Sequence, residues 1–130
     1  MKDESLTEVI IGCAFRVHSA LEPGFLEKVY ENALRIELLK QDLEVKQQEP
    51  IDVYYDGQVV GSFYADLWVE NRVIVEVKAV RALSKAHEVQ LVNYLTATGI
   101  DTGLLLNFGS SSVQIKHKFR QYKPRQDLLD

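Results

Sequence analysis

Apolar residues recur at steps of three and four near the N-terminus, which is the period of an amphipathic helix. Between Ser5 and Leu21 this stripe consists of Leu6, Val9, Ile10, Cys13, Ala14, Val17 and Leu21. Pro23-Gly24 interrupts the pattern. A second helix is predicted from about Phe25 to Gln41, and its expected buried residues are Leu26, Val29, Ala33, Leu34, Ile36 and Leu38.

The pattern then changes to the alternation and short apolar runs that are typical of strands. The predicted strands are Glu44 to Tyr55 with an interruption at Pro50, Val59 to Val69, Val73 to Ala79, Gly103 to Asn107 and Val113 to Phe119. Asp56-Gly57 is expected to form a hairpin turn, and a third helix is expected from about Ser84 to Thr98, ended by Gly99. The polar tail from Tyr122 is expected to fray. This order predicts an α/β fold in a single domain over residues 1–130.

Three charged residues, Asp66, Glu76 and Lys78, lie inside two of these otherwise apolar strands. A three-residue loop from Glu70 to Arg72 would pair Val69 with Val73 and gather the apolar side chains on one face, whereas a two-residue loop would mix the faces. We therefore expect the three-residue loop. It places Asp66 directly opposite Glu76, with their Cβ atoms roughly 5 Å apart.

Two carboxylates in that position destabilise a sheet unless a cation lies between them. Lys78 shares a face with Glu76, because side chains alternate along a strand. Two carboxylates and one amine are what a divalent-metal site acting on phosphate would use. The pattern also fits a solvent-exposed sheet face on which Lys78 neutralises Glu76, although Trp68 and Ile74 share that face and make it less polar.

Composition narrows the choice of protein class. With 46% hydrophobic and 26% charged residues, the chain is typical of a globular protein. It has no apolar run of about 18 residues and no N-terminus that resembles a signal peptide, so neither membrane insertion nor secretion is expected. We therefore expect a cytoplasmic location. The single cysteine, Cys13, excludes a disulfide within the chain and is expected in the core. A net charge of −4 argues against a surface that coats nucleic acid, but not against a local contact site.

Polar residues at helical spacing form two further patterns. Gly24-x-x-Glu27-x-x-Tyr30 puts Glu27 and Tyr30 on one face of the second helix. Gln90-x-x-x-Tyr94 puts Gln90 and Tyr94 on one face of the third helix. Such residues are also common as half-buried packing residues whose polar tips are satisfied.

Together these residues resemble the GxxExxY proteins, which belong to the PD-(D/E)XK nuclease superfamily. The resemblance covers essentially the whole chain and rests on five motifs in order: Gly24 to Tyr30, Asp66, Glu76-Val77-Lys78, the RecB-like Gln90 to Tyr94 pattern, and Gly103 to Gly109. It implies a restriction-endonuclease-like αβββαβ core, with a mixed central sheet flanked by helices and an extra N-terminal helix. Ala65 stands where the superfamily's first motif has proline, a departure that leaves the Asp66 ligand in place.

The resemblance also implies a chemistry, which is phosphodiester hydrolysis with Mg²⁺ or Mn²⁺. Asp66, Glu76 and the carbonyl of Val77 would hold the ion, since Mg²⁺ prefers oxygen ligands. Lys78 would assist the attacking water or stabilise the transition state, and Glu27 would bind metal through a water or help a second ion. Further roles follow from the two helical motifs: Gln90 would orient Lys78 or the water, Tyr94 would contact substrate phosphate, and Tyr30 would pack in the helix with its hydroxyl on Glu27.

The segment 116–125 carries five Lys or Arg residues with interleaved aromatics and no acidic residue. Lys116, Lys118 and Arg120 are therefore candidate substrate-binding residues, and the aromatics could stack unpaired bases. An equally good interpretation is a charged edge strand that prevents sheet-to-sheet aggregation.

The sequence thus predicts a metal-dependent nuclease that acts on DNA rather than RNA. Two alternatives stay open: a non-catalytic module that binds nucleic acid or protein on the same fold, and a small metal enzyme acting on another phosphate ester. A chain of 130 residues has few insertions with which to read a target sequence, so a homodimer or a partner subunit could supply specificity.

Overall fold

The computed structural model describes residues 2–120 of the chain. Its elements, in order, are α1 (Asp3–Leu21), α2 (Glu27–Leu39), β1 (Val45–Tyr55), β2 (Gln58–Val69), β3 (Val73–Lys78), α3 (Lys85–Thr98), β4 (Thr102–Asn107) and β5 (Gln114–Phe119). The predicted order of helices and strands is confirmed. The tail from Tyr122 lies outside the described residues. None of the described helices has the length and apolar character needed to cross a membrane.

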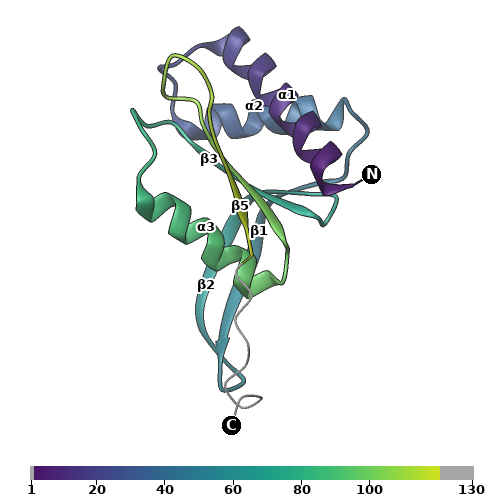
Figure 1. Ribbon diagram of the computed structural model, residues 1–130, viewed down its shortest axis with the longest axis vertical. Helices are drawn as coiled ribbons and strands as arrows, with labels where there is room; N and C mark the ends of the chain where they lie inside the picture. Colours follow the sequence, from purple (N-terminus) through teal and green to yellow (C-terminus); the bar gives the residue numbers. More distant parts are fainter. Residues whose placement is uncertain (1, 121–130) are drawn as a thin grey trace.

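The five strands form one mixed sheet in the order β1-β2-β3-β4-β5. Only β3 and β4 run parallel, because α3 carries the chain from the end of β3 back to the start of β4. The other three neighbouring pairs are antiparallel. Figure 1 shows α1 and α2 on one side of the sheet and α3 on the other, so the molecule is an α/β fold of the restriction-endonuclease-like type.

Each face of the sheet has its own core. Side chains from α1 and α2 pack on Leu67, Val75 and Leu106, whereas α3 packs on Ile74 and Leu105. All six residues of β4 are buried, as expected for a strand covered on both faces. Cys13 is fully buried in the first of these cores, which confirms its prediction as a core residue.

The buried face of α2 differs from the one predicted. Leu26 precedes the first turn and is 83% exposed, and Ile36 is 54% exposed. Val29 is also on the exposed side. The helix instead buries a stripe at steps of four residues, which consists of Tyr30, Leu34 and Leu38. It also buries Glu31, which lies next to this stripe. The prediction is confirmed for Leu34 and Leu38, and Ala33 packs partly buried against the core. It is wrong for Leu26, Val29 and Ile36, and it missed the buried Tyr30 and Glu31.

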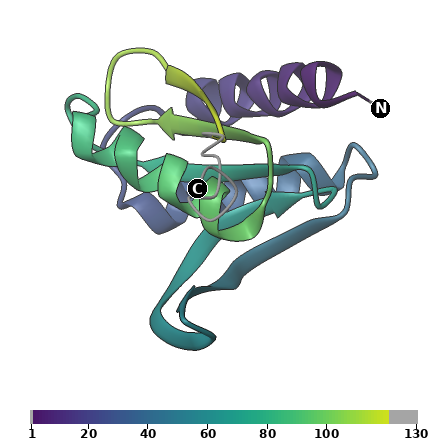
Figure 2. The same cartoon turned by 60° about the horizontal axis from the view of Figure 1, so that its bottom comes forward.

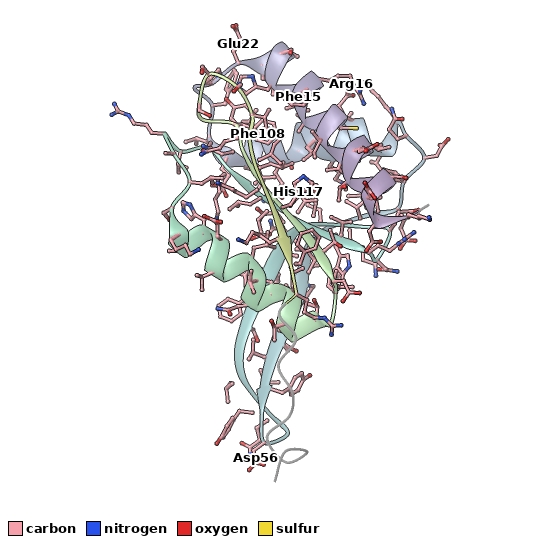
Figure 3. The ribbon with its side chains drawn as sticks, viewed as in Figure 1. Phe15, Arg16, Glu22, Asp56, Phe108 and His117 are labelled. Atoms are coloured by element: carbon pink, nitrogen blue, oxygen red, sulfur yellow. The ribbon has the colours of Figure 1, made fainter. Side chains whose placement is uncertain are left out.

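β1 and β2 form a long hairpin that extends away from the rest of the molecule (Figures 1 and 2). Asp56, in its turn, lies at the far end of this hairpin from Phe108 (Figure 3). The interruption predicted at Pro50 is not found, since Pro50 pairs with Tyr64 inside β1. β1 is an edge strand, and there the missing N–H of proline costs no ladder hydrogen bond.

β2 changes the face that it buries next to Asp66. Ala65 was expected to share a face with Leu67, but Ala65 packs in the α3-side core and Leu67 in the core under α1 and α2. The β1–β2 ladder joins Gln47 to Leu67 and Glu49 to Ala65 and omits the pair between them. This irregularity breaks the strict alternation on which the prediction relied.

Candidate functional site

The turn between β2 and β3 has the predicted register. Val69 pairs with Val73, and the ladder continues to Leu67–Val75. Glu70 and Asn71 both adopt left-handed backbone angles, with φ of 54°. Asn tolerates this conformation well, and the turn closes with a 2.9 Å hydrogen bond from the Arg72 amide to the Val69 carbonyl.

Beyond Leu67–Val75 the two strands are joined by side chains instead of by their backbones. The Asp66 amide donates to Oε2 of Glu76 at 2.8 Å. In return, the Val77 amide donates to Oδ2 of Asp66, also at 2.8 Å. The two carboxylates therefore replace the next rung of the ladder, and they meet where β2 turns away from β3.

This arrangement is electrostatically unfavourable for two ionised acids. Glu76 is only 4% exposed, and burial, followed by the negative charge of Asp66, raises its pKa to about 8. Burial also raises the pKa of Asp66, and the carboxylate of Glu31 adds to the rise. Within residues 2–120 the Glu76 carboxylate accepts one hydrogen bond only, although an ionised carboxylate can accept about four. The pair thus has both excess negative charge and unused acceptor capacity.

Two of the predicted residues bring further charge to the carboxylates. Lys78 ends β3, and its positive charge opposes the rise in pKa of Glu76, Asp66 and Glu27. Glu27, the first residue of α2, is half-buried, and burial raises its pKa while Lys78 counteracts the rise. Within the described residues, Lys78 takes part in none of the ion pairs. Its ammonium group is therefore available to a ligand.

Sequence reasoning missed two residues of this site, Gln48 and Glu31. Glu31 is 2% exposed, and its carboxylate accepts hydrogen bonds from Lys28, Gln47 and Gln48. The Gln48 side chain also donates to Oδ1 of Asp66 at 3.2 Å. The only available signal was that Glu31 follows Tyr30 in the Gly24 to Tyr30 motif, and nothing in the sequence near Gln48 indicated a role.

The two residues of the Gln90-x-x-x-Tyr94 motif lie differently with respect to the carboxylates. Tyr94 is buried, and its pKa is raised by burial and then by the negative charges of Glu76 and Asp66. Gln90 is exposed, and no hydrogen bond joins it to Lys78 within residues 2–120. Both line a groove of about 830 Å³ between α3 and the β1–β2 hairpin, which also includes Tyr54 and Phe63. Asp66, Glu76 and Lys78 do not line this groove, and Tyr94 is the residue that relates it to the two carboxylates, whose charges act on its hydroxyl.

The three basic candidates lie on β5, the edge strand at the other end of the sheet from β1, or directly after it. Lys118 pairs with Glu88 at 3.0 Å, and Arg120 pairs with Asp101 at 2.9 Å. Lys116 is exposed. The remainder of the basic segment lies outside the described residues, so a role in substrate binding stays a prediction.

The hydroxyl of Tyr30 does not bond to Glu27, contrary to the prediction. It donates to the Glu22 carbonyl at 2.6 Å and accepts from the Phe25 amide at 3.1 Å. The Tyr30 ring stacks on Phe108, with centroids 5.0 Å apart. Tyr30 thus packs in the core as expected. Its hydroxyl, however, holds the loop before α2 in place, and with it the position of Glu27 at the start of that helix.

The Gly103 to Gly109 motif holds the chain that follows Lys78. The Asn107 side chain bonds to both backbone groups of Val80, accepting from its amide and donating to its carbonyl at 2.9 Å. The Phe108 amide donates to the Lys78 carbonyl at 2.8 Å. These contacts fix the end of β3, and hence the direction in which Lys78 leaves it.

Gly109→Ala is expected to destabilise the protein by about 2 kcal/mol or more, because a Cβ has no room there. It would lie 2.5 Å from the Val80 nitrogen and 2.7 Å from the Ala79 carbonyl carbon, which are backbone atoms that cannot swing aside. Urea denaturation measures the loss. Gly12→Ala in α1 is the control, since its Cβ would come no nearer than 3.9 Å to another group. Equal stability of the two variants would contradict the close approach at Gly109.

The donor set fits a hard divalent cation held by few protein ligands. Asp66 and Glu76 are the two converging carboxylates, and no cluster of three or more His, Cys, Asp or Glu residues suited to a metal occurs in residues 2–120. Mg²⁺ is commonly bound by one or two carboxylates and keeps several waters. A site with two carboxylates and a neighbouring lysine is therefore compatible with Mg²⁺ or Mn²⁺, but not with a cage built from protein ligands alone.

Comparisons with known proteins agree with this geometry. The family model of the PD-(D/E)XK nuclease superfamily matches residues 4–120. Neither the curated proteins nor the solved structures give a match. The matched region includes every described strand and helix except the first residue of α1, and it contains Asp66, Glu76 and Lys78. The chain belongs to the PD-(D/E)XK nuclease superfamily.

Proposed function

We propose that the protein is a Mg²⁺- or Mn²⁺-dependent nuclease that hydrolyses phosphodiester bonds in DNA. The observation that carries this proposal is the pair of reciprocal hydrogen bonds that brings Asp66 and Glu76 together beside Lys78. A protein that only binds nucleic acid has no need of a buried and a half-buried acid together with a cation at one point. Membership of a nuclease superfamily supports the same reaction class.

The proposed ion site consists of the carboxylates of Asp66 and Glu76, with the Val77 carbonyl as a further oxygen ligand. A divalent cation bound there would supply positive charge to the phosphate and to the oxygens that attack and leave. Its binding would also relieve the repulsion that raises the pKa of Glu76. The Asp66 and Glu76 carboxylates are held in place by backbone amides, so little reorganisation is needed when the site is filled.

Lys78 has the role of stabilising charge in the hydrolysis. Water adds to phosphorus and gives up a proton to solvent, the bond from phosphorus to the leaving oxygen breaks, and that oxygen takes up a proton from solvent. Negative charge builds up on the phosphate oxygens and on the leaving oxygen as this happens. The Lys78 ammonium stands on the same strand as Glu76, two residues further on, and can donate hydrogen bonds to the phosphate or hold the attacking water. Glu27 faces the same charges from α2 and is proposed to bind a water or a second ion.

The DNA strand is proposed to leave the carboxylates along the groove between α3 and the hairpin. Tyr94 belongs both to the groove and to the surroundings of Glu76, so it is placed to contact the phosphate next to the cleaved bond. Tyr54 and Phe63 add aromatic faces on which bases could stack, and Gln90 adds an amide. Within residues 2–120 the groove is lined by no Lys or Arg and by one acid, Asp52, so away from Tyr94 this distribution favours contact with bases over contact with phosphates.

Purified protein is expected to cleave DNA in the presence of Mg²⁺ or Mn²⁺ and to lose that activity on addition of EDTA, because both carboxylates need the cation to act. Single- and double-stranded DNA and RNA of equal length, labelled at one end and followed on denaturing gels, identify the substrate. Restoration by Mn²⁺ after EDTA is the positive control. Binding of DNA without cleavage under any of these conditions would favour the non-catalytic module on the same fold.

A further inference from the structure

Gln48 has an unusual backbone for a residue inside a strand. Its φ is 52°, and among residues 2–120 the other non-glycine residues with positive φ all lie in turns or at a helix end. The ladder between β1 and β2 is interrupted at Gln48 and at Asp66, the residue that lies across from it on β2. Strain of this kind persists only where surrounding contacts compensate for it, and it occurs often at functional sites.

The contacts that compensate are those of the Gln48 carboxamide. Its nitrogen lies 3.1 Å from each oxygen of Glu31 and 3.2 Å from Oδ1 of Asp66. One neutral amide thus donates to two carboxylates that come from different elements, α2 and β2. Without this donor no group within residues 2–120 would bridge the two acids, and their mutual repulsion would be unrelieved between them.

The contact with Gln48 completes the fixation of Asp66. Oδ2 of Asp66 already accepts from the Val77 amide on β3, and Oδ1 accepts from Gln48 on β1. With both oxygens held from opposite strands, the plane of the carboxylate is set and cannot rotate about its last bond. The free lone pairs of both oxygens then point in a fixed direction relative to Glu76.

We propose that Gln48 is a positioning residue, which orients Asp66 for cation binding and separates it from Glu31. This inference rests on the proposed function, since it concerns the same ion site. The left-handed backbone at Gln48 follows from this role, because it turns the side chain of an edge strand towards Asp66. Partners that orient a metal ligand commonly change affinity by about 10- to 100-fold when they are removed.

Mn²⁺ titration by calorimetry of four proteins tests the proposal: the wild type, Gln48→Ala, Gln48→Gly and Gln47→Ala. Gln48→Ala is expected to weaken Mn²⁺ binding about 10-fold or more. Gln48→Gly removes the same amide but accepts the positive φ without strain, so it should fold at least as well as Gln48→Ala and lose the same affinity. Gln47→Ala is the matched control, because Gln47 donates to Glu31 and Asn32 but not to Asp66. It should bind Mn²⁺ like the wild type.

A second readout needs no metal. The Val77 amide donates to Asp66, so its resonance in a ¹H–¹⁵N NMR spectrum reports on the orientation of that carboxylate. This resonance should shift in both Gln48 variants and stay in place in Gln47→Ala. If Mn²⁺ affinity and the Val77 resonance are the same in the Gln48 variants as in Gln47→Ala, Gln48 does not position Asp66. If the wild type itself binds no Mn²⁺, the proposed nuclease function fails, and the Val77 resonance alone then decides whether Gln48 orients Asp66.

Discussion

Lys78→Ala is expected to lower the rate of DNA cleavage by about 100-fold or more, since it removes a positive charge that stands beside the two carboxylates. The Lys78 charge acts on Glu76, Asp66 and Glu27, and within the described residues no ion pair neutralises it. Single-turnover cleavage of end-labelled DNA, with enzyme in excess over substrate, measures this step without interference from product release.

Mn²⁺ affinity separates the catalytic role of Lys78 from a structural one. Loss of a positive charge next to two carboxylates should leave Mn²⁺ binding unchanged or make it tighter, while cleavage falls. Lys40→Ala removes the same charge from the end of α2, where Lys40 pairs with Glu37, and should leave the cleavage rate unchanged. Lys78→Arg keeps the charge but changes its geometry and hydrogen bonding, and is expected to give an intermediate rate. Cleavage that survives Lys78→Ala at the wild-type rate would come from a contaminating nuclease and would remove the enzymatic claim.

The part of the site that the sequence could predict is the part that depends on strict alternation. From Leu67 to Val75 the alternation is strict, with one set of residues in the core under α1 and α2 and with Trp68 and Ile74 on the opposite face. Only one loop length suited this pattern, and that register is found. The third helix could be predicted equally well, because Ser84 and Gly99 are residues that commonly begin and end helices. Ser84 caps α3, and Gly99 ends it in a left-handed conformation.

No sequence pattern marks the positions at which this alternation fails. Gln48 has a left-handed backbone that no local pattern indicates, and on the neighbouring strand Ala65 packs in the α3-side core, not in the one predicted. Glu31 is buried because three donors from α2 and β1 surround it, and those partners meet only after the strands have paired. The predicted buried face of α2 was wrong in part for the same reason, since Tyr30 is buried by stacking on Phe108, which is 78 positions later in the chain. Contacts between distant segments decide these positions, and a hydrophobic period cannot predict them.

Glu76→Gln is expected to stabilise the metal-free protein at alkaline pH, although it removes a proposed metal ligand. The pKa of Glu76 is raised from 4.5 to about 8 in the folded protein, first by burial and then by Asp66. Folding therefore takes up a proton between these two values, and the free energy of unfolding falls as the pH rises through that window. Above pH 8 the full cost of the buried charge is present, and below pH 4.5 it is absent. Gln is never charged and its side-chain oxygen can still accept from the Asp66 amide, so the variant avoids this cost.

Urea denaturation at pH 5, 7 and 9 in EDTA measures the free energy of unfolding of the wild type and of Glu76→Gln. The variant should be more stable by about 2 kcal/mol or more at pH 9, because one pKa unit corresponds to about 1.4 kcal/mol. At pH 5 the two proteins should differ little. Glu88→Gln is the control of opposite sign, since the hydrogen bond from Lys118 holds the pKa of Glu88 below its usual value and favours the charged form. Saturating Mn²⁺ should reverse the order at pH 9, because a cation that binds only the folded state stabilises the wild type and not the variant that lacks a ligand. If the stability of the wild type in EDTA does not fall between pH 5 and pH 9, and Mn²⁺ adds nothing to it, then the pKa of Glu76 is not raised by its surroundings and Glu76 is not half of an ion site.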